Sequence, residues 1–284
     1  MPKKSARILL VVNLHKDDSR ELMRGIVRDL GEEGYFVDTF AFEGKPESSP
    51  GGDYDIVFSL GGDGTVLFAA RELSGRGIPI LPINLGTLGF IASVHRDGWR
   101  RSFNAWIDGS ASVSSRLMLD VRVERAGCQI YSFSCLNDAV VSASGISKII
   151  RLDATMDSIR LGRYRADGLI LATPTGSTAY SVAAGGPILD PEMEAIILNP
   201  VCPFTLSNRP IVIPATGDLR IDVEAEQRSA VILTIDGQIV VPLEPGDALN
   251  VRKAPKKAML VASDRGEFFT ALRSKLNWSG GPDA

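Results

Sequence analysis

The segment GGDGT, residues 61–65, combines three glycines with one carboxylate, Asp63. It follows the apolar run 55–60 and precedes an apolar stretch with helical spacing, so it is expected to join a strand to a helix. Backbone N–H groups and the helix dipole attract anions at such a junction, and glycine lets the backbone approach phosphate oxygens closely. The segment is therefore predicted to bind phosphate; the structural alternative is a tight Asp–Gly turn.

The two common phosphate-binding loops do not match this segment. The pattern GxxxxGK[ST] does not occur in the chain, and GxGxxG fails at its third glycine, where Leu67 stands. A carboxylate beside phosphates is electrostatically unfavourable unless it takes part in the chemistry or holds a metal. Asp63 is therefore the candidate catalytic residue.

A second polar block is DGLILATPTGSTAYSVAAGGP, residues 167–187. A short apolar strand is expected to enter TPTGSTAY, where Ser177 or Thr178 can cap a small-residue helix whose first N–H groups bind an anion or a ligand amide. Tyr180 offers a flat face and a hydroxyl suited to a nucleobase or a nicotinamide. The alternative is a glycine-rich connection between strands.

Two shorter pairs have the chemistry of ligand contacts. Asn137 and Asp138 lie between apolar runs and can hydrogen-bond a ribose diol or an amide, although an Asx turn is the simpler explanation of the pair alone. Arg165 precedes Asp167 by two residues, and these side chains can pair with each other or bind a charged ligand.

The first hundred residues alternate between strand and helix patterns. A helix capped by Ser19 and others at 65–73 and 99–107 separate continuous apolar runs, which are typical of strands covered on both faces. This order predicts an α/β domain with a mostly parallel sheet. The strands are expected at 7–13, 35–40, 55–60 and 78–83.

From residue 117 to residue 263 the dominant pattern is short alternating strands separated by turn signals. This pattern predicts a β-rich, sandwich-like domain, interrupted by the glycine-rich stretch 173–186. The tail 267–276 returns to helical spacing and is expected to pack back on the first domain. The predicted domains are 1–110, with the tail 265–284 returning to it, and 111–264.

Composition limits the class of protein. With 44% hydrophobic and 23% charged residues the chain is typical of a soluble globular protein, and its net charge of −3 argues against binding nucleic acid or an anionic membrane. Three cysteines without CxxC spacing indicate reduced, buried thiols, and the only two histidines, His15 and His95, are far apart in sequence. The apolar N-terminal run is too short for a secretory signal, and no run reaches the roughly 20 residues that span a bilayer. A cytoplasmic location is expected.

Taken together, these blocks resemble the NAD kinase family. Its motifs occur here in order over roughly residues 7–278: GGDGT, NLGTLGF (84–90), the Asn–Asp step, DGLI…TPTGSTAYS…AGGP and a closing helix near KLNW (275–278). GGDGT alone is shared with diacylglycerol-type lipid kinases and sphingosine kinases, whereas TPTGSTAYS is specific. The resemblance departs from the family at Phe68, where several relatives carry a polar residue, and at Ala183, where many carry serine.

The resemblance implies a role for each matched residue. Asp63 corresponds to the acid that takes the proton from the ribose 2′-hydroxyl of NAD, and Lys148 falls at a contact position where the family varies. Around the donor phosphates the implied residues are Gly61, Gly62, Gly64 and Thr65. Around NAD they are Asn137, Asp138, Arg165, Asp167, Thr178, Ala179, Tyr180, Ser181 and Gln238.

The expected reaction is ATP-dependent phosphorylation of NAD to NADP, with polyphosphate as the alternative donor and NADH as the alternative acceptor. A divalent metal, Mg²⁺, is expected to arrive on the nucleotide phosphates, because the sequence shows no carboxylate cluster for a protein metal cage. The resemblance further implies a homodimer or homotetramer. The rival interpretations are a lipid kinase that shares GGDGT and a non-catalytic dinucleotide sensor.

Overall fold

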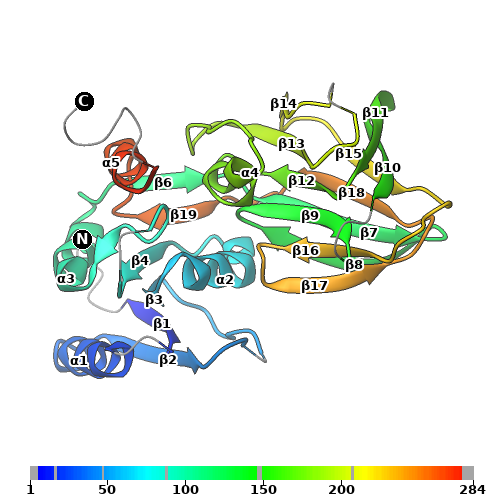
Figure 1. Cartoon of the computed structure of the whole chain (residues 1–284). Helices are drawn as coiled ribbons and strands as arrows, with labels where there is room; N and C mark the ends of the chain where they lie inside the picture. Colours follow the sequence, from blue (N-terminus) through cyan, green and yellow to red (C-terminus); the bar gives the residue numbers. More distant parts are fainter. Residues whose placement is uncertain are drawn as a thin grey trace. The chain divides into compact units, whose positions relative to one another are not determined.

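The computed structural model describes residues 6–15, 18–46, 48–86, 89–145, 149–205 and 208–276. The chain divides into two compact units, one formed by Met1–Arg116 together with Lys256–Ala284 and the other by Leu117–Pro255 (Figure 1). Among the described residues no helix is long and apolar enough to cross a membrane.

The first unit is built on a seven-stranded sheet in the order β2-β1-β3-β4-β19-β6, with β5 beside β4. Pairing is parallel from β2 through β4 to β19, and β19 and β6 are antiparallel. The predicted mostly parallel sheet is therefore confirmed. Its strands are β1 (Arg7–Asn13), β2 (Phe36–Phe42), β3 (Ile56–Gly61), β4 (Ile80–Asn84), β5 (Val94–His95), β6 (Val113–Arg116) and β19 (Ala258–Val261).

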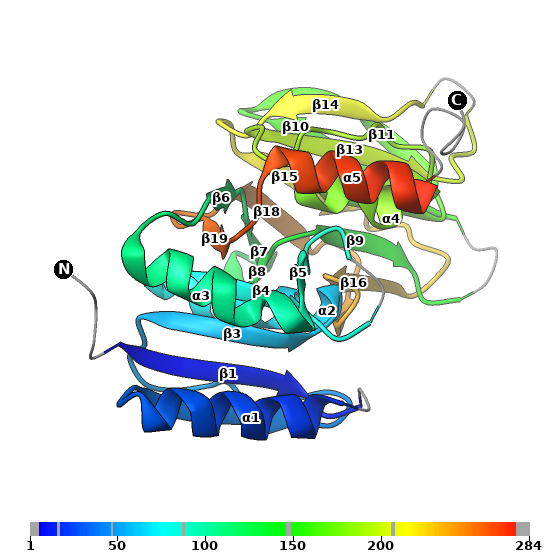
Figure 2. The same cartoon turned by 90° about the vertical axis from the view of Figure 1, so that its left-hand side faces the viewer.

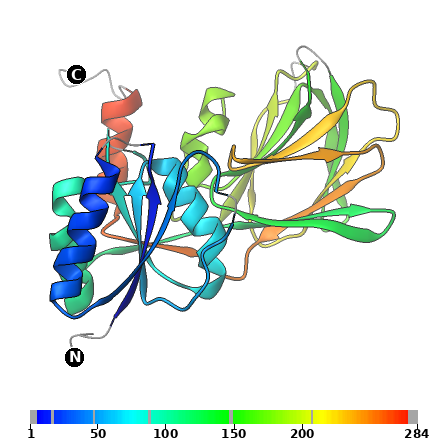
Figure 3. The same cartoon turned by 90° about the horizontal axis from the view of Figure 1, so that it is seen from below.

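Helices cover both faces of this sheet. The central strands β1 and β3 are therefore buried along almost their whole length. Side chains of α1 and α3, such as Ile26 and Phe103, join one core cluster with Ile8 and Phe58 of the strands. Figure 2 shows α1 lying along β1, and in Figure 3 the blue α1 and the cyan α2 lie on opposite sides of the sheet. The helices are α1 (Ser19–Glu32), α2 (Asp63–Leu73), α3 (Trp99–Asp108) and α5 (Arg265–Leu276), with 3₁₀ turns at Ser74–Arg76 and Arg96–Gly98.

The strand order places GGDGT at a favourable position for a ligand. Chain order reverses between β1 and β3, and open α/β sheets bind ligands beyond the carboxyl ends of strands at such a reversal. GGDGT begins at the carboxyl end of β3. Its helix α2 starts at Asp63, two residues before the predicted start at Thr65, because Gly62 already acts as the N-cap.

The domain bounds predicted from sequence assigned residues 113–116 and 258–261 to the β-rich domain. The structure corrects this assignment: β6 pairs with β19, and β19 pairs in parallel with β4, so both strands extend the sheet of the first unit. Their alternating pattern is the same in either sheet, which is why the sequence did not separate them. Phe68, the departure noted above, is buried on α2 and stacks on Phe40 of β2.

The second unit consists of two six-stranded antiparallel sheets, in the orders β11-β10-β15-β18-β7-β8 and β14-β13-β12-β9-β16-β17. One apolar cluster draws side chains from both sheets, including Val121 and Leu249 of the first and Val141 and Leu171 of the second. The predicted sandwich-like domain is thus confirmed. The strands are β7 (Leu119–Arg125), β8 (Cys128–Cys135), β9 (Asp138–Ala143), β10 (Ile150–Met156), β11 (Ile159–Ala166), β12 (Gly168–Ala172), β13 (Ala195–Val201), β14 (Ile211–Pro214), β15 (Leu219–Val223), β16 (Val231–Ile235), β17 (Ile239–Leu243) and β18 (Ala248–Lys253).

Strand β9 lies between β12 and β16 inside the second sheet, so the Asn–Asp step at its start is held on both sides. After β12 the chain forms a 3₁₀ turn (Thr175–Thr178) and the short helix α4 (Tyr180–Ala183). Leu189 then packs on the outer face of the same sheet against Ile170 and Ile197. The glycine-rich block is therefore a folded cover on this sheet.

Candidate functional site

The Asp63 carboxylate is bound by three successive backbone N–H groups in the loop after β4. Phe90 donates to Oδ2 at 3.0 Å, and Ile91 and Ala92 donate to Oδ1 at 3.2 Å and 2.8 Å. A carboxylate offers about four lone-pair positions. Within the described part of the chain these bonds leave one position on Oδ2 for a further donor. The group is partly exposed, so a ligand hydroxyl can reach it.

Close packing around Asp63 requires glycine at two positions. A Cβ added to Gly89 would lie 1.9 Å from Asp63 Oδ1, and one added to Gly61 would lie 2.1 Å from Thr65 Oγ1. The loop is fixed from its other side by Asn84, whose Nδ2 donates to the Ala92 carbonyl at 3.2 Å. The sequence motif thus serves packing as well as any contact with phosphate.

The residues predicted to line the donor phosphates differ in their exposure. Gly61 and Thr65 are buried, Gly62 is partly exposed, and Gly64 is exposed on the first turn of α2. Gly62 and Gly64 are therefore the two residues of the set that solvent reaches. Residues 87 and 88 of the predicted NLGTLGF motif, and 277 and 278 of KLNW, lie outside the described residues.

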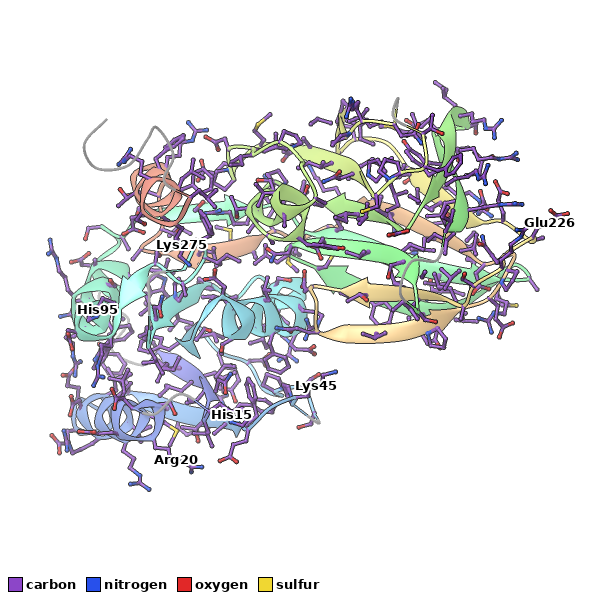
Figure 4. All side chains as sticks on the ribbon, in the orientation of Figure 1. His15, Arg20, Lys45, His95, Glu226 and Lys275 are labelled. Atoms are coloured by element: carbon purple, nitrogen blue, oxygen red, sulfur yellow. The ribbon has the colours of Figure 1, made fainter. Side chains whose placement is uncertain are left out.

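A cavity of about 320 Å³ lies beside the same loop in the first unit. Gly89 and Phe90 line it from the loop, and Glu267 and Phe268 line it from the start of α5. Phe90 and Phe268 have ring centroids 6.4 Å apart, and Lys275, labelled in Figure 4, lies over the Phe90 ring at 5.4 Å. Burial raises the pKa of Glu267 above its ordinary value.

A second cavity, of about 340 Å³, lies at the start of β9 in the second unit. Four predicted site residues line it: Asn137, Asp138, Ala179 and Tyr180. Sequence reasoning missed the rest of the lining, because these residues lie on strand faces and in a hairpin turn without a recognisable motif. They are Val140, Ser142, Thr234, Asp236 and Gly237.

Two side chains in this region indicate a polar ligand. Asn137 is only 9% exposed, yet its Oδ1 has no hydrogen-bond partner among the described residues, and the same holds for Oγ1 of buried Thr175. Buried polar atoms are nearly always paired, so Asn137 Oδ1, at the cavity wall, is an acceptor for a bound group or a water molecule. Asp138 adds charge: burial, and secondarily the charge of Asp236, raises its pKa to about 7.

The remaining predicted NAD contacts do not line this cavity. Ser181 is fully buried, and its carbonyl accepts a hydrogen bond from Asn199 Nδ2 at 2.8 Å, which is a packing role. Arg165 forms no ion pair with Asp167 among the described residues; its guanidinium lies 4.8 Å from the Phe204 ring centroid. Thr178 and Gln238 also lie outside the lining of this cavity. Lys148 lies outside the described residues.

In the described part of the chain, no group of three or more His, Cys, Asp or Glu side chains could hold a metal ion. Of the cysteines, which were predicted to be buried, Cys135 is buried, whereas Cys128 and Cys202 are exposed. Figure 4 shows His15 and His95 at separate places on the first unit. Any divalent metal at the first site would depend on ligands from elsewhere, such as nucleotide phosphates.

The chain is thus a two-domain α/β and β protein with a glycine–aspartate loop at the end of a parallel strand and a polar cavity in the antiparallel β domain. Two family models, described as ATP-NAD kinase N-terminal domain and ATP-NAD kinase C-terminal domain, match residues 44–111 and 136–263. An NAD kinase from Treponema denticola is 41% identical over 277 residues, covering 96% of this chain and 97% of the relative. The chain belongs to the ATP-NAD kinase family and is a phosphotransferase.

Solved structures agree with this assignment. The crystal structure of a yeast NADH kinase complexed with NADH superposes with a TM-score of 0.83 at 25% identity, covering 98% of this chain and 89% of that one. An NAD kinase from Archaeoglobus fulgidus, in complex with ATP, shares the fold with a TM-score of 0.73 at 24% identity, covering 94% and 97%.

Proposed function

We propose that this chain transfers the γ-phosphoryl group of ATP to the 2′-hydroxyl of the adenosine ribose of NAD, giving NADP and ADP, with Asp63 as the general base. The observation that supports this role is the partly exposed carboxylate of Asp63, fixed by three backbone N–H groups and retaining an acceptor position on Oδ2. A sugar hydroxyl is a poor nucleophile, and a positioned carboxylate can accept its proton.

In the proposed step the ribose 2′-oxygen forms a bond to the γ-phosphorus while the bond from that phosphorus to the β–γ bridging oxygen breaks. The hydroxyl proton passes to Asp63 Oδ2, and ADP leaves with the electron pair. Phosphoryl transfer depends mainly on positioning and charge neutralisation. The chain positions its base by hydrogen bonds, and we assign the donor phosphates to the loop around Gly62 and Gly64, which are not buried.

The second unit is proposed to bind NAD. The unpartnered Asn137 Oδ1 can accept from an amide or a hydroxyl, Asp138 can bond a ribose diol, and the exposed ring of Tyr180 can stack on a base. Ala179 lines the same cavity and is assigned a contact with the same ligand. On the family resemblance alone we assign further contacts to Lys148, Arg165, Asp167, Thr178, Ser181 and Gln238.

Mg²⁺ bound to the ATP phosphates would neutralise charge that a loop lysine neutralises in other kinases. In the first unit Asp63 is the carboxylate of the glycine loop, and its oxygens already accept three hydrogen bonds. A metal carried by the nucleotide fits this donor set better than a protein-bound one.

We also propose that the protein is cytoplasmic and forms a homodimer or homotetramer. A monomer mass in light scattering would overturn the proposed assembly.

The assay that tests the function uses purified protein with Mg-ATP and NAD and follows NADP. Parallel reactions replace NAD by NADH or diacylglycerol, and ATP by polyphosphate. We expect NADP from Mg-ATP and NAD, and no phospholipid product. Failure to form NADP or NADPH with either donor would reject the proposal, and phospholipid formation would favour the lipid kinase.

A further inference from the structure

Every backbone N–H and C=O group of residues 136–138 is hydrogen-bonded to one of two residues, Asp236 and Thr173, which directly follow strands β16 and β12. The Asp236 carboxylate accepts the N–H groups of Leu136, Asn137 and Asp138 at 3.2, 2.7 and 3.2 Å. The Asp236 N–H donates to the Asp138 carbonyl at 2.9 Å. Thr173 donates its hydroxyl to the Leu136 carbonyl at 2.5 Å and its N–H to the Asn137 carbonyl at 2.8 Å.

Asp236 reaches this segment from the hairpin turn between β16 and β17. Asp236 and Gly237 both have positive φ, 49° and 66°, and Gln238 donates its N–H to the Ile235 carbonyl at 2.9 Å, as in a type I′ turn. Many Asp or Asn residues would make this turn equally well. The additional feature is a carboxylate, only 6% exposed, bonded to a segment 98 to 100 residues earlier.

The 3₁₀ turn after β12 also packs against residues 136–138. A Cβ added to Gly176 would lie 2.1 Å from the Asn137 carbonyl oxygen, so the 3₁₀ turn after β12 packs directly on this backbone. Thr173 also accepts the Gly176 N–H at 3.0 Å, which ties that turn to the same hydroxyl. With its backbone held in this way, the Asn137–Asp138 step is fixed at the wall of the cavity of the second unit, which both residues line.

We infer that Asp236 and Thr173 are positioning residues for NAD: they fix the Asn137–Asp138 step so that the unpartnered amide oxygen and the neighbouring carboxylate meet the ligand in one orientation. This inference rests on the proposed function. It accounts for a buried carboxylate placed beside another carboxylate, an arrangement that electrostatics alone disfavours.

The chain offers a matched control for Asp236. Asp157 has the same φ of 49°, also in a hairpin turn of the second unit, and its carboxylate also accepts a backbone N–H, that of Asp218 at 2.9 Å. Asp157 does not line the cavity at β9. Both Asp→Asn substitutions keep a residue that tolerates positive φ, and both replace one acceptor oxygen by an NH₂ group.

The experiment measures NAD binding directly by calorimetric titration, without turnover, in wild type, Asp236→Asn and Asp157→Asn. Because hydrogen bonds to a charged group carry much of the positioning, we expect Asp236→Asn to raise the NAD dissociation constant about tenfold or more, and Asp157→Asn to leave it unchanged. In an Asn137→Ala/Asp138→Ala background, Asp236→Asn should add less than about twofold, because its effect acts through those two side chains.

Equal NAD affinity in the two Asp→Asn variants would overturn the inference, as would an undiminished effect in the double-alanine background. If Asp236→Asn does not fold, Thr173 decides: Thr173→Val removes the hydroxyl and should weaken NAD binding, whereas Thr173→Ser keeps it and should bind as wild type does. Equal binding by those two would reject the inference. Failure of the proposed function is separate, since it is a wild-type protein that binds no NAD or forms no NADP.

Discussion

Asp63 and Asp236 are held in the same way in different units. Each carboxylate accepts three successive backbone N–H groups from a loop beside a strand, two on Oδ1 and one on Oδ2. Asp63 begins a helix and is partly exposed, whereas Asp236 sits in a hairpin turn and is buried. Identical hydrogen bonding therefore occurs at a proposed catalytic base and at a proposed positioning residue.

Backbone hydrogen bonds therefore hold a carboxylate in place but do not assign its role. What differs is exposure: Asp63 is partly exposed, whereas Asp236 is only 6% exposed at the wall of the cavity that it lines. The neighbours differ as well, because Asp236 lies close enough to Asp138 to raise the pKa of that group. Role follows from what can reach the oxygen, so variants of the two residues should fail in different measurements.

The largest expected effect is that of Asp63→Asn. Loss of a general base lowers kcat by roughly 10²–10⁴-fold, while NAD affinity should stay close to that of the wild type. Asp236→Asn should show the opposite division, with weakened NAD binding and a kcat at saturating NAD within about threefold of wild type. Steady-state kinetics and calorimetric titration of both variants measure this division. An unchanged kcat in Asp63→Asn would remove that residue from its role.

The sequence predicted what depends on local pattern. The continuous apolar run of β1 and the helical spacing of α1 identified both elements closely, and GGDGT identified the junction of β3 with α2. Each of these patterns repeats every two to four residues along the chain, so a short stretch of sequence is enough to detect a buried strand or an amphipathic helix. The Asn137–Asp138 pair was found for the same reason, as adjacent polar residues between two apolar runs.

The sequence could not identify residues that act across long separations. Asp236 binds backbone about a hundred positions away, and as the first residue of an Asp–Gly turn it already had a sufficient local explanation. Thr173 is the first residue of the TPTGSTAY block, and nothing local marks it. Its hydrogen bonds to the carbonyl groups of residues 136 and 137 form only when β9 and β12 pair.

A smaller effect concerns stability and pH, through Asp138. Its pKa in the folded protein is about 7, against an ordinary value of 3.8, so the folded state retains a proton that the unfolded state releases. The resulting stabilisation is complete below about pH 4 and is lost as pH rises to 7, a change of up to about 4 kcal/mol in the free energy of unfolding. Asp138→Asn should lack this contribution.

Urea unfolding of wild type and Asp138→Asn at pH 4.5 and pH 8 measures the difference. We expect the wild type to lose more stability than the variant over this interval, with Asp157→Asn following the wild type. Asp236→Asn should fall between them, because burial is the larger cause of the raised Asp138 pKa and the Asp236 charge the smaller. Parallel curves for wild type and Asp138→Asn would contradict the raised pKa and weaken the contrast between the two carboxylate sites.

The smallest effects separate the loops that donate to the two carboxylates. In Gly176→Ala the new Cβ would meet the Asn137 carbonyl oxygen at 2.1 Å and its carbon at 2.5 Å, atoms of a backbone that is bonded on every side. In Gly89→Ala its three nearest atoms would all belong to the Asp63 carboxylate, the first at 1.9 Å, and this side chain can rotate away by giving up its hydrogen bonds. Overpacking costs typically about 1–3 kcal/mol, and Gly176→Ala should lie at or above the upper end.

The two alanine variants should therefore differ in kind as well as in size. Gly176→Ala should unfold at lower urea concentration and bind NAD more weakly, whereas Gly89→Ala should keep NAD affinity and lose kcat, because the displaced group is the base itself. Gly25→Ala is the control: it lies in α1 with no atom within 4 Å of the added Cβ, so it should stabilise the protein by roughly 0.5–1 kcal/mol and leave activity unchanged. A Gly89→Ala variant with normal kcat would mean that the held position of Asp63 is not the reactive one.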